Sequence, residues 1–157
     1  MNQIEVVNPI LTYPQKSLRE SIAKQQDYRY RIGDKGEEYV LSMERKRLEG
    51  TEYADMIEDH RDDPGAHYDF LSYTTHGEYI FLEVKTTSHA DPHVDFYMSL
   101  EEVDFAWGVL ENGNFYELHR VYDVNGKIGR LVFSGEWLLR EYDFVATNFA
   151  VRLNKTA

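Results

Sequence analysis

The alternation of apolar and polar positions predicts one central β-hairpin, around which the rest of the chain is arranged. Two runs rich in β-branched and aromatic residues, 68–74 and 78–85, flank a short turn at 75–77. Both faces of both runs are mainly apolar, which is typical of central strands covered by helices on each side. With three residues in the turn, Asp69 falls directly opposite Glu83 on one face.

Periodic patterns outside the hairpin predict further helices and strands in a mixed order. Helices are predicted over residues 17–27, 34–49 and 99–110, with Ser17, Asp34 and Ser99 as their N-caps, and a short helix or turn is predicted over residues 134–140. Strands are predicted over residues 53–57, 94–98, 115–122, 128–133 and 142–153, and residues 58–65 are predicted to be a polar loop.

These elements together predict the fold class and the domain organisation. The expected class is α/β (α+β), with a central mixed β-sheet, an antiparallel core hairpin and helices flanking both faces. We expect residues 1–32 to form an N-terminal arm and helix that pack on a single domain of residues 33–157.

The charge distribution restricts which surface could contact nucleic acid. The chain has 17 Lys and Arg against 28 Asp and Glu, for a net charge of −11. Residues 1–50 are net +1 and residues 51–157 are net −12, so a surface that faces phosphates would draw on the first third. The candidates are Arg29, Arg31, Lys35, Arg45, Lys46 and Arg47, although solvated helix positions explain these residues equally well.

No pattern in the sequence indicates a membrane or secreted protein. No run approaches the roughly 18 apolar residues of a membrane span, and residues 1–5 do not begin a signal peptide. The chain has no cysteine, which excludes disulfides and thiolate metal sites. We therefore expect a cytoplasmic protein with no membrane partner.

Three chemically active side chains share one face of the predicted hairpin. Asp69 and Glu83 are opposed, and Lys85 projects from the same face because strand side chains alternate. Opposed like charges repel, and a divalent cation between the two carboxylates would remove that repulsion. Mg²⁺ prefers such hard oxygen ligands, and the Val84 backbone carbonyl is a further candidate ligand. Lys85 could orient or deprotonate an attacking water, or stabilise a charged transition state.

Glu37 is a separate candidate, on the helix predicted over residues 34–49. It lies three residues before Val40, at the edge of the predicted buried stripe and near the helix N-terminus. Taken alone, an acid in this place is most simply a first-turn residue favoured by the helix dipole.

Five short motifs follow one another along the chain. They are Gly33-x-x-Gly36-Glu37-x-x-Val40, Tyr68-Asp69-Phe70-x-Ser72, Tyr79-Ile80-Phe81-Leu82-Glu83-Val84-Lys85-Thr86-Thr87, Phe96-Tyr97-Met98-Ser99-x-x-Glu102 and Tyr116-x-Leu118-x-Arg120-Val121. Together they resemble the PD-(D/E)XK, or restriction-endonuclease-like, nuclease superfamily. Within it they are similar to the branch known as DUF3883, or the C-terminal domain of the NO VEIN protein. The resemblance covers about residues 33–133.

The resemblance implies a restriction-endonuclease-like fold and a set of site residues. By resemblance, Asp69 and Glu83 are metal ligands and Lys85 is the catalytic lysine. Glu37 would reach the same site from its helix. The implied cofactor is Mg²⁺, with Mn²⁺ as an expected substitute.

Two details of the resemblance concern neighbouring residues. Tyr68 precedes Asp69 where the superfamily name has proline, a departure that many members share. Ser99 and Glu102 match the branch pattern, but a capping box explains both residues fully, so they receive no catalytic role.

The expected function is that of a metal-dependent nuclease, an endonuclease-type hydrolase of phosphodiester bonds with DNA as its expected substrate. The first alternative is a catalytically inactive binding module on the nuclease fold, acting in a larger complex. The second is an acidic mimic of DNA that inhibits a nucleic-acid-binding enzyme. Members of the branch are often fused to helicase or ATPase modules, so a helicase, ATPase or other subunit is an expected partner. A homodimer is open as well, and the nucleic-acid-binding residues are unknown from sequence.

Overall fold

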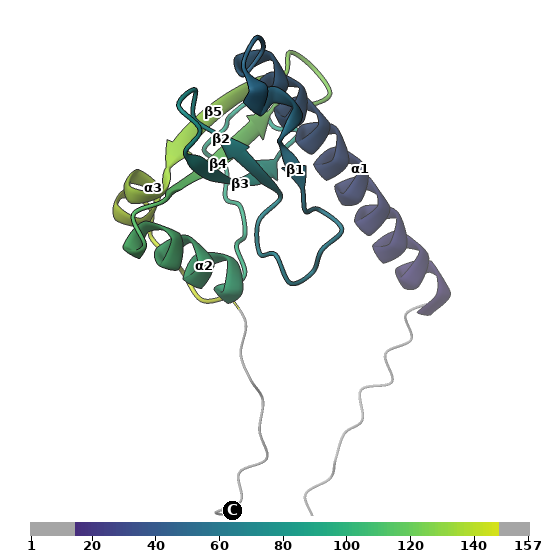
Figure 1. Ribbon diagram of the computed structural model, residues 1–157. Coiled ribbons are helices and arrows are strands. Elements are labelled where there is room, and N and C mark those ends of the chain that lie inside the picture. The colour runs from purple at the N-terminus through teal and green to yellow at the C-terminus, as the bar shows by residue number, and fades with distance from the viewer. Residues whose placement is uncertain (1–14, 148–157) are drawn as a thin grey trace, which may run out of the picture.

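A computed structural model describes residues 15–147, which form a five-stranded sheet between helices (Figure 1). The helical elements are α1 (Gln15–Arg47), the 3₁₀ helix η1 (Glu52–Asp55), α2 (Leu100–Glu111) and α3 (Gly135–Glu141). The strands are β1 (Glu58–Asp59), β2 (Phe70–Tyr73), β3 (Tyr79–Thr86), β4 (Phe115–Tyr122) and β5 (Gly129–Ser134). The predicted mixed α+β class is confirmed.

The strands lie in the sheet in their order along the chain, and one pair is parallel. β3 and β4 run parallel and are joined through α2, whereas β1–β2, β2–β3 and β4–β5 are antiparallel. A parallel pair requires a crossover long enough to hold a helix, which α2 supplies. The sheet is therefore mixed, with the predicted antiparallel hairpin β2–β3 at its centre.

The register of the central hairpin agrees with the sequence prediction. The ladder runs from Phe70 opposite Leu82 to Tyr73 opposite Tyr79. At the turn, the Thr74 amide donates to the Glu78 carbonyl at 2.8 Å. The ladder ends at Phe70 and Leu82, and just beyond it the Asp69 amide donates to the Leu82 carbonyl, so Asp69 lies against β3 near Glu83.

Each face of the sheet packs against its own helices. On one face, α1 covers a cluster of buried residues: Val40, Leu41, Phe70, Ile80, Leu82, Val84 and Val121. On the other face, α2 and α3 cover Ala106, Val109, Tyr116, Leu118, Phe133 and Leu138. Burial on both faces explains why the hairpin strands are apolar on both faces.

The first helix is continuous, and the predicted break before residue 34 is wrong. α1 runs 33 residues from Gln15 to Arg47, so Ser17 and Asp34 lie within it and do not begin separate helices. Strong helix formers surround its two glycines, each of which costs only about 1 kcal/mol in a helix. The predicted boundary between residues 32 and 33 falls inside this helix.

The N-terminal half of α1 extends past the sheet. Every residue from Arg19 to Arg31 is exposed, and burial begins at Ile32 (Figure 1). An ion pair between Arg31 and Asp27, at 2.6 Å, supports the exposed half. Among the residues that the structure describes, no helix is long and apolar enough to cross a membrane.

Two predicted strands are replaced by other structures. Residues 53–57 overlap η1, because the Thr51 hydroxyl accepts from the Tyr53 amide and caps a helical turn. The predicted polar loop at 58–65 begins instead with β1, a two-residue strand at the sheet edge.

Residues 94–98 form no strand either, because side-chain contacts occupy part of their backbone. The Arg120 guanidinium donates hydrogen bonds to the backbone carbonyls of Pro92 and Val94 at 3.0 and 3.1 Å. Residues 142–147 are not a strand, and the remainder of the predicted strand 142–153 lies outside the described residues.

Candidate active site

Asp69 stands at the open end of the hairpin, one residue before β2. Its amide donates to the Leu82 carbonyl at 2.8 Å, and its Oδ2 accepts from the Val84 amide at 2.7 Å. Two bonds to the backbone of β3 therefore fix this carboxylate beside Glu83, as the hairpin register predicts. His67, two residues earlier, has φ of 60°, so the chain turns sharply just before the site.

The backbone carbonyl of Val84 lies on the same side of β3 as Asp69. The amide and carbonyl of one strand residue point to the same side, and the Val84 amide points at Asp69. The ladder with β2 begins only at Phe70, so the Val84 carbonyl faces the edge beyond it. This backbone oxygen is thus close to the two carboxylates that the sequence selected.

Glu83 is a buried carboxylate, with only 4% of its surface exposed. Burial, followed by the nearby charge of Asp69, raises its pKa to about 8. Burial raises the pKa of Asp69 as well, against the hydrogen bond from the Val84 amide. Two buried acids that resist ionisation together are a site where a cation would be stabilising.

Lys85 joins this pair to the start of α2. Its Nζ lies 2.7 Å from Oε1 of Glu83 and 3.0 Å from Oε2 of Glu102. Burial would lower the pKa of Lys85, but the charges of Glu83 and Glu102 outweigh it and hold the pKa above its usual range. The ammonium therefore stays charged in the interior between two carboxylates.

Glu102 is a residue of the site that sequence reasoning missed. Its predicted capping box is present, because Ser99 Oγ accepts from the Glu102 amide at 3.1 Å and Glu102 Oε2 accepts from the Ser99 amide at 2.9 Å. The same carboxylate also binds Lys85. The motif Ser-x-x-Glu was the available signal, but capping accounted for it without any contact across the fold.

Glu37 comes to the site from α1, as the resemblance implies. Its pKa is raised to about 7, first by burial and then by the charge of Asp69. Its Oε2 lies 3.7 Å from Nη1 of Arg61, which moderates that rise. Glu37 is therefore a third acid of this group, at the edge where α1 crosses the hairpin end.

Arg61 was not predicted, and no local pattern distinguishes it in a polar loop. Its guanidinium binds Asp59 at 2.5 Å and Glu38 at 2.7 Å, and it lies 5.1 Å from the centre of the Phe70 ring. These contacts tie α1 to the segment after β1. Arg61 thereby closes one wall of the site and supplies a positive charge near Glu37.

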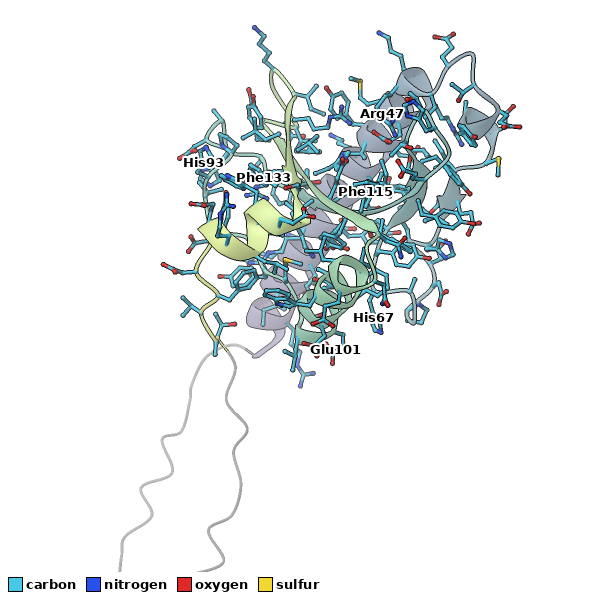
Figure 2. All side chains as sticks on the ribbon, turned by 60° about the vertical axis from the view of Figure 1, so that its left-hand side comes forward. Arg47, His67, His93, Glu101, Phe115 and Phe133 are labelled. Carbon is cyan, nitrogen blue, oxygen red and sulfur yellow. The ribbon has the colours of Figure 1, made fainter. Side chains whose placement is uncertain are left out.

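The carboxylates face a cleft of about 460 Å³. Asp69, Glu83 and Glu102 line it together with His60, Arg61 and His67. Glu101 lines it as well, and Figure 2 shows His67 and Glu101 on the same side of the molecule, away from Arg47. The site is therefore open to a ligand from one side.

A second cleft of about 540 Å³ adjoins the first at Ser99 and Glu102. Lys85, Tyr97 and Met98 line this second cleft, and Ser99 and Glu102 line both clefts. Glu83 lines only the first. The ion pair between Lys85 and Glu83 thus connects the two spaces.

The donors present fit a hard divalent cation. Asp69, Glu83 and the Val84 carbonyl are all oxygen ligands, the type that Mg²⁺ prefers. The buried Tyr116 hydroxyl has no hydrogen-bond partner in the described part of the chain. Burial raises the pKa of Tyr116, and the charges of Glu83, Glu102 and Asp69 raise it further, which places this orphaned hydroxyl near the acids.

Within the described part of the chain, side chains alone build no metal site. Among residues 15–147, no group of three or more His, Asp or Glu side chains is arranged to hold a metal ion. A cation here would depend on two carboxylates, a backbone carbonyl and water, which is the ligand set Mg²⁺ commonly takes.

A second buried polar cluster lies on the opposite face of the hairpin and is fully satisfied. Glu44, 2% exposed, binds Nη2 of Arg47 at 2.5 Å and the Ser72 hydroxyl at 2.8 Å. Arg47 also donates to the Tyr73 carbonyl at 2.7 Å. The cluster attaches α1 to β2, and it removes Arg47 from the side chains available for phosphate.

The other basic candidates on α1 remain at the surface. Arg29, Arg31, Lys35, Arg45 and Lys46 are exposed. Arg31 is paired with Asp27, and Lys35 donates to the Asn125 side chain at 3.1 Å. None of these side chains contacts the cleft carboxylates in the described structure, so the site and the basic helix are distinct features.

Comparison with known proteins gives one match. A family model described as Protein NO VEIN, C-terminal, matches residues 36–133, which is more than half of the 157 residues. The matched segment contains Glu37, Asp69, Glu83, Lys85 and Glu102. No curated protein and no solved structure matches the chain.

Proposed function

We propose that this chain, which belongs to the Protein NO VEIN, C-terminal, family, is a metal-dependent nuclease that hydrolyses phosphodiester bonds in DNA. The observation that carries the proposal is the contact between the buried Asp69–Glu83 pair and Lys85 beside an open cleft. A fold with the restriction-endonuclease-like arrangement, and membership of the PD-(D/E)XK superfamily, are parts of the same proposal.

The residues proposed to hold Mg²⁺ or Mn²⁺ are Asp69, Glu83 and Val84, the last through its carbonyl. When bound there, the cation would supply charge neutralisation at the phosphate and a lowered pKa for water. Burial keeps both carboxyl pKa values high without it, and the charge of Asp69 raises the pKa of Glu83 further. A divalent cation bound between Asp69 and Glu83 would therefore stabilise both side chains as charged carboxylates.

Lys85 is proposed to act on the phosphate and the water. Its ammonium is charged and is kept beside the carboxylate pair by Glu102, so it can donate hydrogen bonds to an anionic oxygen as negative charge develops there. Placement on a central strand limits its movement.

Glu37 is proposed as the group that handles a proton. Its pKa of about 7 lies near neutrality, where a carboxylate can both accept and release a proton. It lies close to Asp69 and Arg61, two residues that line the cleft.

The substrate assignment is supported by the unequal distribution of charge. α1 has nine Lys and Arg against six Asp and Glu, whereas residues 48–147 have six against 21. A polyanion would be repelled by the acidic body and attracted by α1. Contact with DNA is therefore proposed to involve the exposed part of this helix.

A cleavage assay with matched variants tests the function. Supercoiled plasmid, single-stranded DNA and single-stranded RNA are each incubated with the protein in Mg²⁺, Mn²⁺ or chelator. Glu83→Gln and Lys85→Met should each reduce the rate by about 100-fold or more. Glu111→Gln makes the same charge change as Glu83→Gln at the exposed far end of α2 and should leave the rate unaltered. Cleavage that is equal in all four proteins would refute the proposal.

The acidic body favours one second candidate, a nuclease-fold module that binds a partner without catalysis. Its motivation is the excess of acids outside α1, which weakens any productive contact with phosphate. Titration calorimetry separates the two functions. Absence of Mn²⁺ binding at millimolar concentration, together with absence of cleavage, would favour the module.

A further inference from the structure

Glu83 has two incompatible partners in the proposed reaction. In the structure its Oε1 accepts from Lys85 Nζ at 2.7 Å. The proposed function requires the same buried carboxylate as a cation ligand, next to Asp69. A positive ammonium and a divalent cation repel each other, so occupation by one opposes occupation by the other.

Lys85 already contacts a second carboxylate, that of Glu102. Its Nζ also lies 3.2 and 3.0 Å from the two carboxylate oxygens of Glu102. If the contact with Glu83 is broken, the buried ammonium keeps a charged partner and is not left unpaired. An unpaired buried charge would be strongly unfavourable, so this second partner decides whether Glu83 can be released.

Glu102 is fixed in position before any ligand arrives. Its carboxylate accepts from the Ser99 amide and its own amide binds the Ser99 hydroxyl, which anchors the side chain at the start of α2. A pre-fixed partner loses little conformational entropy when it accepts a further hydrogen bond.

The lining of the two clefts shows where Lys85 lies relative to Glu83 and Glu102. Glu83 lines only the first cleft and Lys85 lines only the second, while Glu102 borders both. An ammonium that leaves Glu83 and stays bound to Glu102 therefore remains at the border between the two clefts.

We propose that Glu102 is a positioning residue that retains Lys85 in the site and thereby frees Glu83 to bind the cation. This inference rests on the proposed function for the identity of the cation site. It assigns Glu102 a role across the fold in addition to its cap, without direct contact to metal or substrate.

Calorimetric titration of Mn²⁺ into the metal-free full chain tests the inference without any cleavage assay. Glu102→Gln keeps an oxygen that can accept from the Ser99 amide but loses the charge that holds Lys85. We expect Mn²⁺ affinity to fall about tenfold, the equivalent of one charged hydrogen bond. Glu111→Gln removes the same charge at the exposed far end of α2 and is expected to change the affinity less than about threefold.

A double-mutant cycle isolates the route through Lys85. In a Lys85→Met background there is no ammonium to compete for Glu83, so Glu102→Gln is expected to change Mn²⁺ affinity less than about threefold. An equal loss in both backgrounds would overturn the inference, because Glu102 would then act through its charge alone. Absence of Mn²⁺ binding to the wild-type chain would overturn it as well.

The outcome is separable from that of the proposed function. A chain that binds Mn²⁺ with the expected coupling but cleaves no nucleic acid would retain the role of Glu102 and lose the nuclease. Thermal unfolding of Glu102→Gln, followed by circular dichroism, checks that the variant is folded. A variant that is unfolded is replaced by Glu102→Asp, which keeps the charge but shortens the reach to Lys85 and should also weaken Mn²⁺ binding.

Discussion

Gly36 packs so closely against Thr86 that a Cβ atom at Gly36 would overlap the Thr86 side chain. This contact brings α1 onto the end of β3, immediately beyond Glu83 and Lys85. Glu37, the next residue along α1, is thereby held beside Asp69. Because Gly36 has no side chain, α1 can approach β3 closely enough for Glu37 to lie beside Asp69.

Substitution of Gly36 should separate α1 from β3. Gly36→Ala is expected to lower the free energy of unfolding by about 1–3 kcal/mol, because overpacking outweighs the gain in helix propensity. Gly33→Ala is the matched control, since a Cβ at Gly33 meets no atom within 4 Å. The control should be more stable than wild type by about 0.5–1 kcal/mol in urea unfolding. Equal stabilisation by both substitutions would contradict the close contact.

The buried Glu44 cluster should contribute strongly to stability. Glu44→Gln leaves Arg47 without its charged partner and is expected to lower the free energy of unfolding at neutral pH by about 3 kcal/mol. The exposed pair of Arg140 and Glu141, 2.6 Å apart, provides the control. Glu141→Gln should change stability by less than about 0.5 kcal/mol.

The same cluster predicts an acid-dependent effect. Burial would raise the pKa of Glu44, but hydrogen bonds from Arg47 and Ser72 outweigh it and hold the pKa below its usual value. Its stabilisation is therefore present above the unfolded pKa of 4.5 and is lost as pH falls through the folded pKa. The difference between wild type and Glu44→Gln should shrink in that acid range, measured by urea unfolding at a series of pH values. A difference independent of pH would be evidence against the charged cluster.

The acids at the cleft predict the opposite dependence in metal-free protein. Glu83 has a pKa of about 8, against 4.5 for the ordinary carboxyl, with Asp69, Lys85 and Glu102 as the charged groups that face it. Between these pH values the folded chain holds a proton that the unfolded chain has lost, so stability falls as pH rises. The slope attributable to one such proton is about −1.4 kcal/mol per pH unit.

Glu83→Gln removes that titration. Its free energy of unfolding should vary less than that of wild type between pH 5 and pH 8, about the range set by the ordinary and raised pKa values. Glu111→Gln, exposed and distant, should retain the wild-type slope. Parallel curves for wild type and Glu83→Gln would show that Glu83 ionises normally in the folded chain.

The orphaned hydroxyl of Tyr116 gives a further test. Tyr116 is 1% exposed and its hydroxyl has no partner among the described residues. Tyr116→Phe should therefore be as stable as wild type without metal, or should have a free energy of unfolding higher by about 1 kcal/mol. The reason is that the substitution removes a buried unpaired polar group. Differential scanning calorimetry measures the change. A loss of stability greater than about 1 kcal/mol would mean that the hydroxyl has a hydrogen-bond partner.

The sequence was most informative where the interactions are local. The register of the hairpin follows from turn length and strand alternation, and the observed ladder from Phe70 and Leu82 to Tyr73 and Tyr79 agrees with it. The cap of α2 by Ser99 and Glu102 is a four-residue pattern, and it is present as predicted. Such features depend on residues only a few positions apart, so the printed sequence contains all the information they require.

Local rules failed where tertiary packing outweighed them. The sequence predicts two separate helices over residues 17–27 and 34–49, yet α1 is continuous, and Gly36 within it allows the close approach to Thr86. Residues 94–98 have the composition of a strand, but Arg120 donates hydrogen bonds to the backbone carbonyls of Pro92 and Val94. In each case a partner many residues away determines the backbone.

The hairpin that carries Asp69, Glu83 and Lys85 on one face was thus determined by the sequence itself, because side chains alternate along a strand and the turn sets the register. Only the tertiary structure brought Glu37 and Arg61 to one side of these residues and Glu102 to the other. The physical reason is that those contacts join α1, the loop after β1 and α2, whose positions depend on packing against opposite faces of the sheet. No spacing along the chain records which helix covers which face.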